Sequence, residues 1–203
     1  MLIKTLTVGQ LDENCYVVTN EKTLECVVID PGDESNYILN YIEDNHLKCQ
    51  AVMITHGHFD HTGAALAVAE ETGAAVYMNT RDDCRVTPTE QLRFSLPDGG
   101  INYDDGDIID AAGMRFEILA TPGHTPGGVT IRCEDCLFTG DTLFRGSIGR
   151  TDLGGGDSGK LYSSLKKLCK LEGDYEIYPG HMGTTTLQRE RSFNYYCRAA
   201  MSM

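Results

Sequence analysis

The segment AVMITHGHFDH, from Ala51 to His61, joins an apolar run directly to a cluster of histidines. Its first five residues are almost wholly apolar, which is typical of a strand that is covered on both faces of a sheet. His56 and His58 are two residues apart, so an extended chain projects both side chains to the same side. Asp60 and His61 follow where the chain turns into a helix, and they can point elsewhere. The segment therefore predicts ligands for two metal ions.

Three more polar residues stand directly after apolar runs, as the histidine cluster does. They are His124, Asp141 and His181, each in a short polar or glycine-rich stretch. Strands that end together bring the following loops to one rim, where functional loops on a rigid scaffold are commonly found. We therefore expect these three residues to lie beside the residue 56–61 cluster.

The candidate ligands divide into two sets of three, with one carboxylate left to join them. His56, His58 and His124 would hold one ion, Asp60, His61 and His181 a second, and Asp141 would bridge the two. Three protein ligands and an open position are typical of a catalytic metal site, whereas a structural zinc site usually has four ligands. Mixed histidine and carboxylate ligands suit zinc, iron or manganese. Two such ions would lower the pKa of bound water to roughly 7, which supplies a nucleophile at neutral pH.

Strand and helix patterns alternate along the rest of the chain. Hydrophobic periodicity predicts strands at residues 2–8, 12–19, 24–30, 51–55, 75–78, 107–110, 114–120, 128–133, 136–139 and 175–178. It predicts helices at residues 34–47, 62–72, 159–170 and 184–198. We interpret residues 79–106 as a short helix and a long surface excursion, and residues 140–157 as a glycine-rich loop. Two sheets packed face to face, with helices outside them, satisfy this order and predict an α+β fold.

Length and composition favour one domain that spans residues 1–203. A chain of 203 residues can bury one large core, and no repeat or linker-like composition break divides it. The longest apolar runs are too short to cross a bilayer, so no membrane partner is expected. The net charge of −13 repels a phosphate backbone and argues against a nucleic-acid partner.

The cysteines and the N-terminus favour a cytoplasmic protein. The chain has eight cysteines, most of them inside apolar stretches, and its first residues favour a strand over a signal peptide. Reduced thiols are therefore expected rather than a disulfide framework. Cys133 and Cys136 flank a Glu-Asp pair that is typical of a tight hairpin turn.

The motifs together resemble the metallo-β-lactamase superfamily. The resemblance rests on His56 to His61, on Thr-Pro-Gly-His124-Thr-Pro-Gly-Gly, on Thr-Gly-Asp141-Thr and on Tyr-Pro-Gly-His181. Within that superfamily, Gly-Asp141-Thr-Leu-Phe followed by Gly-Arg150-Thr-Asp is similar to the glyoxalase II-like hydrolases. The resemblance implies a four-layer αββα sandwich. It also implies that Asp30, in Val-Ile-Asp-Pro-Gly, orients ligands or holds a loop.

Glyoxalase II-like enzymes hydrolyse thioesters of the S-lactoylglutathione, or hydroxyacylglutathione, type. The resemblance therefore implies a small-molecule thioester substrate, two divalent ions that are most simply zinc, and Asp60 and Asp141 as catalytic carboxylates. In this mechanism a metal-held hydroxide attacks the thioester carbonyl and a thiolate leaves. The chain ends about 22 residues after His181, so we expect a short form without the C-terminal helical domain of the full-length enzymes. Arg145 and Arg150 are candidate substrate-binding residues.

Other functions remain open at this point. A persulfide dioxygenase of the same fold would hold one iron with His56, His124 and Asp141 only. A lactonase, or a metal-bound module without catalysis, would also fit the ligand pattern. The sequence leaves open the acyl group, the thiol carrier, the physiological metal and the oligomeric state.

Overall fold

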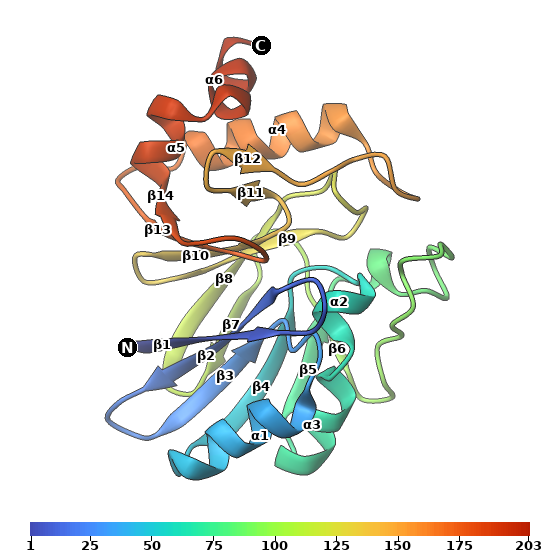
Figure 1. The fold of residues 1–203 in the computed structure, drawn as a ribbon, viewed down its shortest axis with the longest axis vertical. Coiled ribbons are helices and arrows are strands. Elements are labelled where there is room, and N and C mark those ends of the chain that lie inside the picture. Colours follow the sequence, from blue (N-terminus) through green and yellow to red (C-terminus); the bar gives the residue numbers. More distant parts are fainter.

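The computed structural model describes residues 1–203 and arranges them in four layers (Figure 1). The first sheet contains, in spatial order, β1 (Leu2–Val8), β2 (Glu13–Asn20), β3 (Glu25–Ile29), β4 (Lys48–Ile54), β5 (Ala75–Met78) and β6 (Ile101–Asn102). The second contains β14 (Thr185–Thr186), β13 (Glu176–Pro179), β10 (Cys136–Gly140), β9 (Val129–Cys133), β8 (Met114–Ala120) and β7 (Ile108–Ala111). Helices α1 (Ser35–Asp44) and α3 (Ala65–Thr72) cover the outside of the first sheet. Helices α4 (Ser158–Cys169), α5 (Leu187–Phe193) and α6 (Tyr195–Ser202) cover the second.

Three apolar clusters separate the four layers. The cluster between the two sheets includes Tyr16, Met53, Phe116 and Phe138, all of them buried. A second cluster lies between the first sheet and helices α1 and α3, and a third lies beneath α4 and α6. Apolar burial is the main favourable term in folding, so each interface between layers is stabilised by its own cluster. The αββα sandwich that the motifs implied is confirmed.

Strand β4 positions the histidine cluster. It lies between β3 and β5 and runs parallel to both, and its last four residues are buried, as expected for a strand covered on both faces. It begins at Lys48, three residues before the predicted start at residue 51. The chain leaves β4 at Ile54 and enters α2 (Phe59–Thr62), a single turn that precedes α3.

The predicted helices at residues 62–72 and 184–198 are each interrupted. In place of the first, α2 ends at Thr62 and α3 begins at Ala65; at Gly63, between them, the chain passes so close to Gly32 that a Cβ added at Gly63 would lie 2.3 Å from the Gly32 carbonyl oxygen. The second is wrong as one helix, because β14 is followed by α5 and α6 with a break at Asn194. The backbone of Asn194 is extended, and its side-chain oxygen accepts hydrogen bonds from the first amides of α6. An asparagine is a favoured N-cap, so it starts a new helix rather than continuing the old one.

Residues 79–106 contain the predicted short helix, and both they and the predicted loop at residues 140–157 contain strands that were not expected. Residues 79–106 include the short helix η1 (Thr80–Asp82) and strand β6, and they bury Leu92, Leu96 and Tyr103. Residues 140–157 include a hairpin of β11 (Leu143–Phe144) and β12 (Ser147–Ile148). Cys133 and Cys136 face each other on the β9–β10 hairpin, as predicted. None of the helices has the length and apolar character that spanning a bilayer would require.

Candidate metal centre

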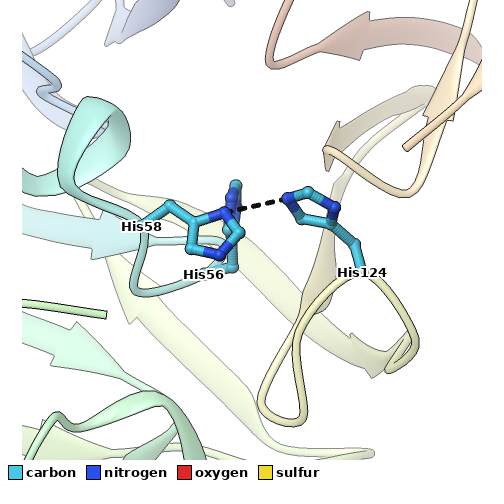
Figure 2. Close-up of side chains that lie close together, drawn as sticks. All are labelled: His56, His58 and His124. Carbon is cyan, nitrogen blue, oxygen red and sulfur yellow. Dashed lines mark hydrogen bonds between the residues drawn. The ribbon is translucent and has the colours of Figure 1, made fainter. Parts of the chain in front are cut away.

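Three histidines from two different sheets meet at the rim of the sandwich (Figure 2). His56 and His58 lie in the loop between β4 and α2, and His124 lies in the loop between β8 and β9. The ring centroids of His58 and His124 are 4.6 Å apart, and His58 Nδ1 is 2.9 Å from His124 Nε2. All three side chains are buried. This group, called the first triad below, could hold one metal ion.

A second group forms beside the first. His181 Nε2 is 3.3 Å from Asp60 Oδ2, and His61 Nε2 is 3.8 Å from the same oxygen. Asp60 and His61 belong to α2, whereas His181 follows β13. This second triad could also hold an ion. The division of the ligands that the sequence predicted is therefore one that the geometry allows; Asp30, His56 and His61 form a third group whose ligand atoms are also close to one another.

Asp141 lies between the two triads. Its Oδ1 is 3.4 Å from His61 Nε2 of the second triad, and its Oδ2 is 3.4 Å from His124 Nε2 of the first. The approach is close enough to require glycine at position 180, because a Cβ added there would lie 2.4 Å from Asp141 Oδ1. The structure thus brings all seven predicted ligands together and places Asp141 where a bridging carboxylate would stand.

The ring orientations follow from hydrogen bonds made by the opposite nitrogens. His124 Nδ1 is 2.7 Å from the carbonyl oxygen of Arg150, and His181 Nδ1 is 3.1 Å from that of Leu11. A carbonyl oxygen can only accept, so each Nδ1 must carry a hydrogen, and in the neutral ring Nε2 keeps a free lone pair. Backbone carbonyls that fix the tautomer of a ligating histidine are a common feature of metal sites. Both Nε2 atoms point into the centre with the electronic form that a ligand needs.

Asp30 fixes His61 and, through Thr55, also His56. Asp30 Oδ1 accepts a hydrogen bond of 2.6 Å from the Thr55 amide. Its Oδ2 accepts from Thr55 Oγ1 at 2.6 Å and lies 3.0 Å from His61 Nδ1. The Thr55 hydroxyl donates to Asp30, so it is free to accept from His56 Nδ1, which is 3.2 Å away. Asp30 therefore orients ligands in both triads, as the family resemblance implied.

Several buried polar atoms in the centre have no partner in the protein. They are Nε2 of His56, His58 and His61 and Oδ1 of Asp141. Buried polar atoms almost always make a hydrogen bond, and a group of exceptions in one place calls for an explanation such as an ion. The orphaned nitrogens of His56 and His61 are the ones that the tautomers leave unprotonated. The residues present therefore fit divalent ions with imidazole and carboxylate ligands.

The charge states of the first triad and of Asp141 agree with this donor set. Burial lowers the pKa of His56 well below its ordinary value, and burial together with His124 lowers the pKa of His58 to about 4. Burial alone would raise the pKa of Asp141. The combined effect of His61, His124 and His181 is larger and lowers this pKa. Two neutral imidazoles and an ionised carboxylate are the forms that bind metal ions. In the second triad, burial lowers the pKa of His61 and His181, but the neighbouring carboxylates outweigh burial and raise both, so an ion bound there would displace protons.

The two predicted substrate-binding arginines lie outside the triads. Arg150 is exposed, and its guanidinium is paired with Asp152, with Nε 2.7 Å from the carboxylate. Arg145 is exposed in the turn of the β11–β12 hairpin, next to Phe144, whose ring centroid is 6.2 Å from that of His181. Their role in substrate binding stays a prediction. The contact of Arg150 with the centre is made by its carbonyl oxygen.

Sequence reasoning did not identify Asp82, which is fully buried beside the first triad. Asp82 ends η1, in a segment that was interpreted as a surface excursion. A signal was available, because Asp82 stands shortly after an apolar strand, β5, as the ligand residues stand after theirs. A lone aspartate after a strand is common, so the signal was weak without the fold.

Comparisons with known proteins agree with the geometry. The model of the metallo-β-lactamase superfamily matches residues 8–181. The hydroxyacylglutathione hydrolase GloC of Haemophilus influenzae is 35% identical over 207 residues, which cover 96% of this chain and 97% of that protein. The crystal structure of the BLEG-1 B3 metallo-β-lactamase matches with a TM-score of 0.86 and 30% identity, and covers 97% of this chain and 99% of its own. The crystal structure of TTHA1623 in a di-iron-bound form matches with a TM-score of 0.82 and 33% identity, over 95% of this chain and 99% of its own.

Proposed function

The chain belongs to the metallo-β-lactamase superfamily, a superfamily of metallo-hydrolases, and we propose that it hydrolyses thioesters of the hydroxyacylglutathione type. The observation that carries the proposal is the pair of preassembled triads joined by Asp141. The similarity to GloC over nearly the full length of both chains supports the choice of substrate class.

Two divalent ions would be held at the centre. His56, His58 and His124 would hold the first, Asp60, His61 and His181 the second, and Asp141 both. Zinc is the simplest assignment, and iron or manganese would suit the same ligands. When bound, the two ions supply an activated water at neutral pH and positive charge for a developing oxyanion.

Asp60 and Asp141 are the proposed catalytic carboxylates. Burial raises the pKa of Asp60, but the hydrogen bond with His181 and the nearby His61 bring it below its ordinary value. Both carboxylates are therefore ionised at neutral pH, and each presents an oxygen to histidines of the triads. Asp60 Oδ2 and Asp141 Oδ1 can orient the attacking water and accept its proton. A thiolate is a good leaving group, so the reaction needs little general acid.

A groove beside the second triad offers room for the substrate. It has a volume of about 400 Å³ and is lined by Leu11, Phe59 and Asp60 among others. Leu11 and Phe59 are both about half exposed, so they offer an apolar wall to one side of a bound thioester. Arg145 and Arg150 are proposed to contact a carboxylate of the thiol carrier. We expect the reaction to take place in the cytoplasm.

A persulfide dioxygenase is the second candidate. Its single iron would be held by His56, His124 and Asp141, and Asp141 Oδ2 does lie 3.4 Å from His124 Nε2. The second triad argues against it, because Asp60, His61 and His181 are also assembled, with hydrogen-bonded His61 and His181 rings. A one-iron site would leave these three residues assembled with no ion to bind.

Metal analysis and a thioester assay on the same preparation test the proposal. We expect two divalent ions per chain, and release of free thiol from S-lactoylglutathione that is followed with a thiol reagent. His46→Asn is the matched control for any histidine variant, because His46 is exposed and precedes the start of β4, at the opposite end of that strand from the triads. One iron per chain with oxygen uptake and sulfite formation from a glutathione persulfide would overturn the hydrolase assignment in favour of the dioxygenase.

A further inference from the structure

Asp82 is a buried carboxylate whose hydrogen bonds all go to the two loops of the first triad. Its Oδ2 accepts from the Gly57 amide at 3.0 Å and from Thr125 Oγ1 at 2.6 Å. Its Oδ1 accepts from the Gly127 amide at 2.6 Å. The side chain is fully buried and makes no salt bridge, so these three donors are what stabilise it.

The positions of these donors give Asp82 a specific place in the metal centre. Gly57 stands between His56 and His58, and Thr125 directly follows His124. One carboxylate therefore ties together the two loops that carry all three ligands of the first triad. The loops come from different sheets, after β4 and between β8 and β9. The fit is close, because a Cβ added at Gly57 would lie 2.5 Å from the Asp82 carbonyl oxygen.

The His181 loop of the second triad is held by a different residue, Asn14 of β2. Asn14 Nδ2 donates to the carbonyl oxygens of Pro179 at 3.0 Å and Met182 at 2.8 Å. These two residues bracket His181. Tyr16 Oη, two residues along the same strand, also donates to the Pro179 carbonyl at 2.6 Å. Strand β2 of the first sheet thus holds the His181 loop of the second sheet.

We propose that Asp82 and Asn14 are positioning residues, each for one metal site, so that the two sites can be weakened separately. Asp82 acts through the backbone and Thr125 on the first triad. Asn14 acts through the carbonyl groups around His181 on the second. The inference rests on the metal-binding part of the proposed function and not on the identity of the substrate.

Two isosteric substitutions provide the test. Asp82→Asn replaces one acceptor oxygen by an amino group that faces donors of the first-triad loops. Asn14→Asp replaces the donor by an oxygen that faces two carbonyl oxygens. Each change keeps shape and volume but reverses a hydrogen-bonding role. Loss of a group that orients metal ligands typically weakens metal binding 10- to 100-fold.

The readout is the dissociation constant of Zn²⁺ at each site, measured by competition with a chromophoric chelator. The sites are assigned with ligand variants: His58→Ala disables the first and His181→Ala disables the second. On the His181→Ala background, Asp82→Asn should weaken the remaining site about tenfold or more, and Asn14→Asp should change it less than about threefold. On the His58→Ala background only the second site remains, so there Asn14→Asp should weaken zinc binding about tenfold or more and Asp82→Asn should change it less than about threefold.

Thr125 provides a milder pair of variants if Asp82→Asn folds poorly. Thr125→Val removes the hydroxyl that donates to Asp82 and keeps the shape, whereas Thr125→Ser keeps the hydroxyl. We expect Thr125→Val to weaken the first site only and Thr125→Ser to retain its affinity. Melting of the metal-free variants, followed by circular dichroism, shows whether the fold is intact.

The outcomes separate this inference from the proposed function. A wild-type chain with two zinc sites, in which each substitution weakens both sites equally or neither, would overturn the separate positioning roles alone. A wild-type chain that binds no divalent ion would overturn both. Loss of the first site in Thr125→Val but not in Thr125→Ser, with the second site unchanged, supports the role of Asp82.

Discussion

Replacing Asp30 by asparagine should weaken the second metal site through the tautomer of His61. In the wild type, Asp30 Oδ2 accepts from Thr55 Oγ1 and lies 3.0 Å from His61 Nδ1, so that Nδ1 carries the hydrogen and Nε2 faces the centre. In Asp30→Asn, the oxygen keeps its place opposite the Thr55 amide and the amino group takes the place of Oδ2. That amino group is a donor, so it favours the His61 tautomer with a free Nδ1 and a hydrogen on Nε2. This tautomer cannot ligate through Nε2.

The magnitude follows from the hydrogen bond that must be given up. To bind an ion, His61 in the variant must return its hydrogen to Nδ1, where it faces another donor and has no acceptor. Glu13 Oε1 is 3.6 Å from Nδ1, too far to replace Asp30. A buried donor without a partner costs about 1–3 kcal/mol, or roughly a 5- to 150-fold loss in affinity at the second site. His56 keeps its acceptor, because the Thr55 hydroxyl oxygen can accept more than one hydrogen bond.

The assay is a zinc competition titration on the His58→Ala background, where only the second site remains. Asp33→Asn is the matched control, because it removes a carboxylate from the same loop at an exposed position. The charge of Asp33 is screened by solvent, so Asp33→Asn should leave the zinc affinity near that of the wild type, and an equal loss in both variants would show that the contact with His61 is not the cause. Equal affinities for wild-type and Asp30→Asn second sites would refute the tautomer argument.

Three further predictions concern activity, metal removal and pH. His58→Ala should abolish thioester turnover while circular dichroism shows a folded chain, whereas His46→Asn should keep full activity; a turnover of His58→Ala near that of the wild type would exclude our site. Removal of metal by a chelator should abolish turnover and lower the melting temperature, since an ion at 100 times its dissociation constant stabilises the fold by about 2.7 kcal/mol. Added zinc should restore both the turnover and the melting temperature. An unchanged melting curve would contradict the binding of metal ions by the folded chain. Hydrogen bonds from Arg85 lower the pKa of Asp83 from 3.8 to about 2, so its stabilising effect is complete above the unfolded-state pKa and is lost as the pH falls toward 2. Urea unfolding of the metal-free chain measures the difference in the free energy of unfolding between wild type and Asp83→Asn. This difference should be about 1 kcal/mol at pH 5, because the partner in the ion pair is exposed, and it should disappear near pH 2. A difference that does not change with pH would show that the ion pair is not its source.

The candidate metal ligands could be predicted from the sequence because their signals are local. His56 and His58 follow the two-residue period of an extended chain, and the strand before them is marked by its own apolar run. The order of strands and helices was sufficient to predict two sheets with helices outside them, since each element must bury its apolar face against another. The structure confirms most of the elements that these local patterns predicted, with shifts of a few residues at their ends; the exceptions are the helix predicted at residues 184–198 and the short strands within residues 79–106 and 140–157.

The contacts that orient the ligands could not be predicted, because they join residues that are distant in the sequence. Gly57 and Asp82 are separated by 25 positions, and Asn14 and Met182 by 168. The prediction of one helix over residues 184–198 failed at Asn194 for a different reason. Its neighbours continue a helical pattern, and only the backbone shows that its side chain caps a new helix instead of lying within the old one.

The distribution of the candidate ligands between the two sheets is the reason to expect that the centre can be altered without loss of the fold. Each triad takes two residues from the segment after β4 in the first sheet and one, His124 or His181, from the second. Ions bound there would therefore cross-link the sheets at the rim. The sheets do not depend on that link, because Phe116, Phe138 and their neighbours already fill the space between them with buried apolar side chains. The sandwich is thus a scaffold that the apolar core stabilises, and the ligand loops are added to its rim.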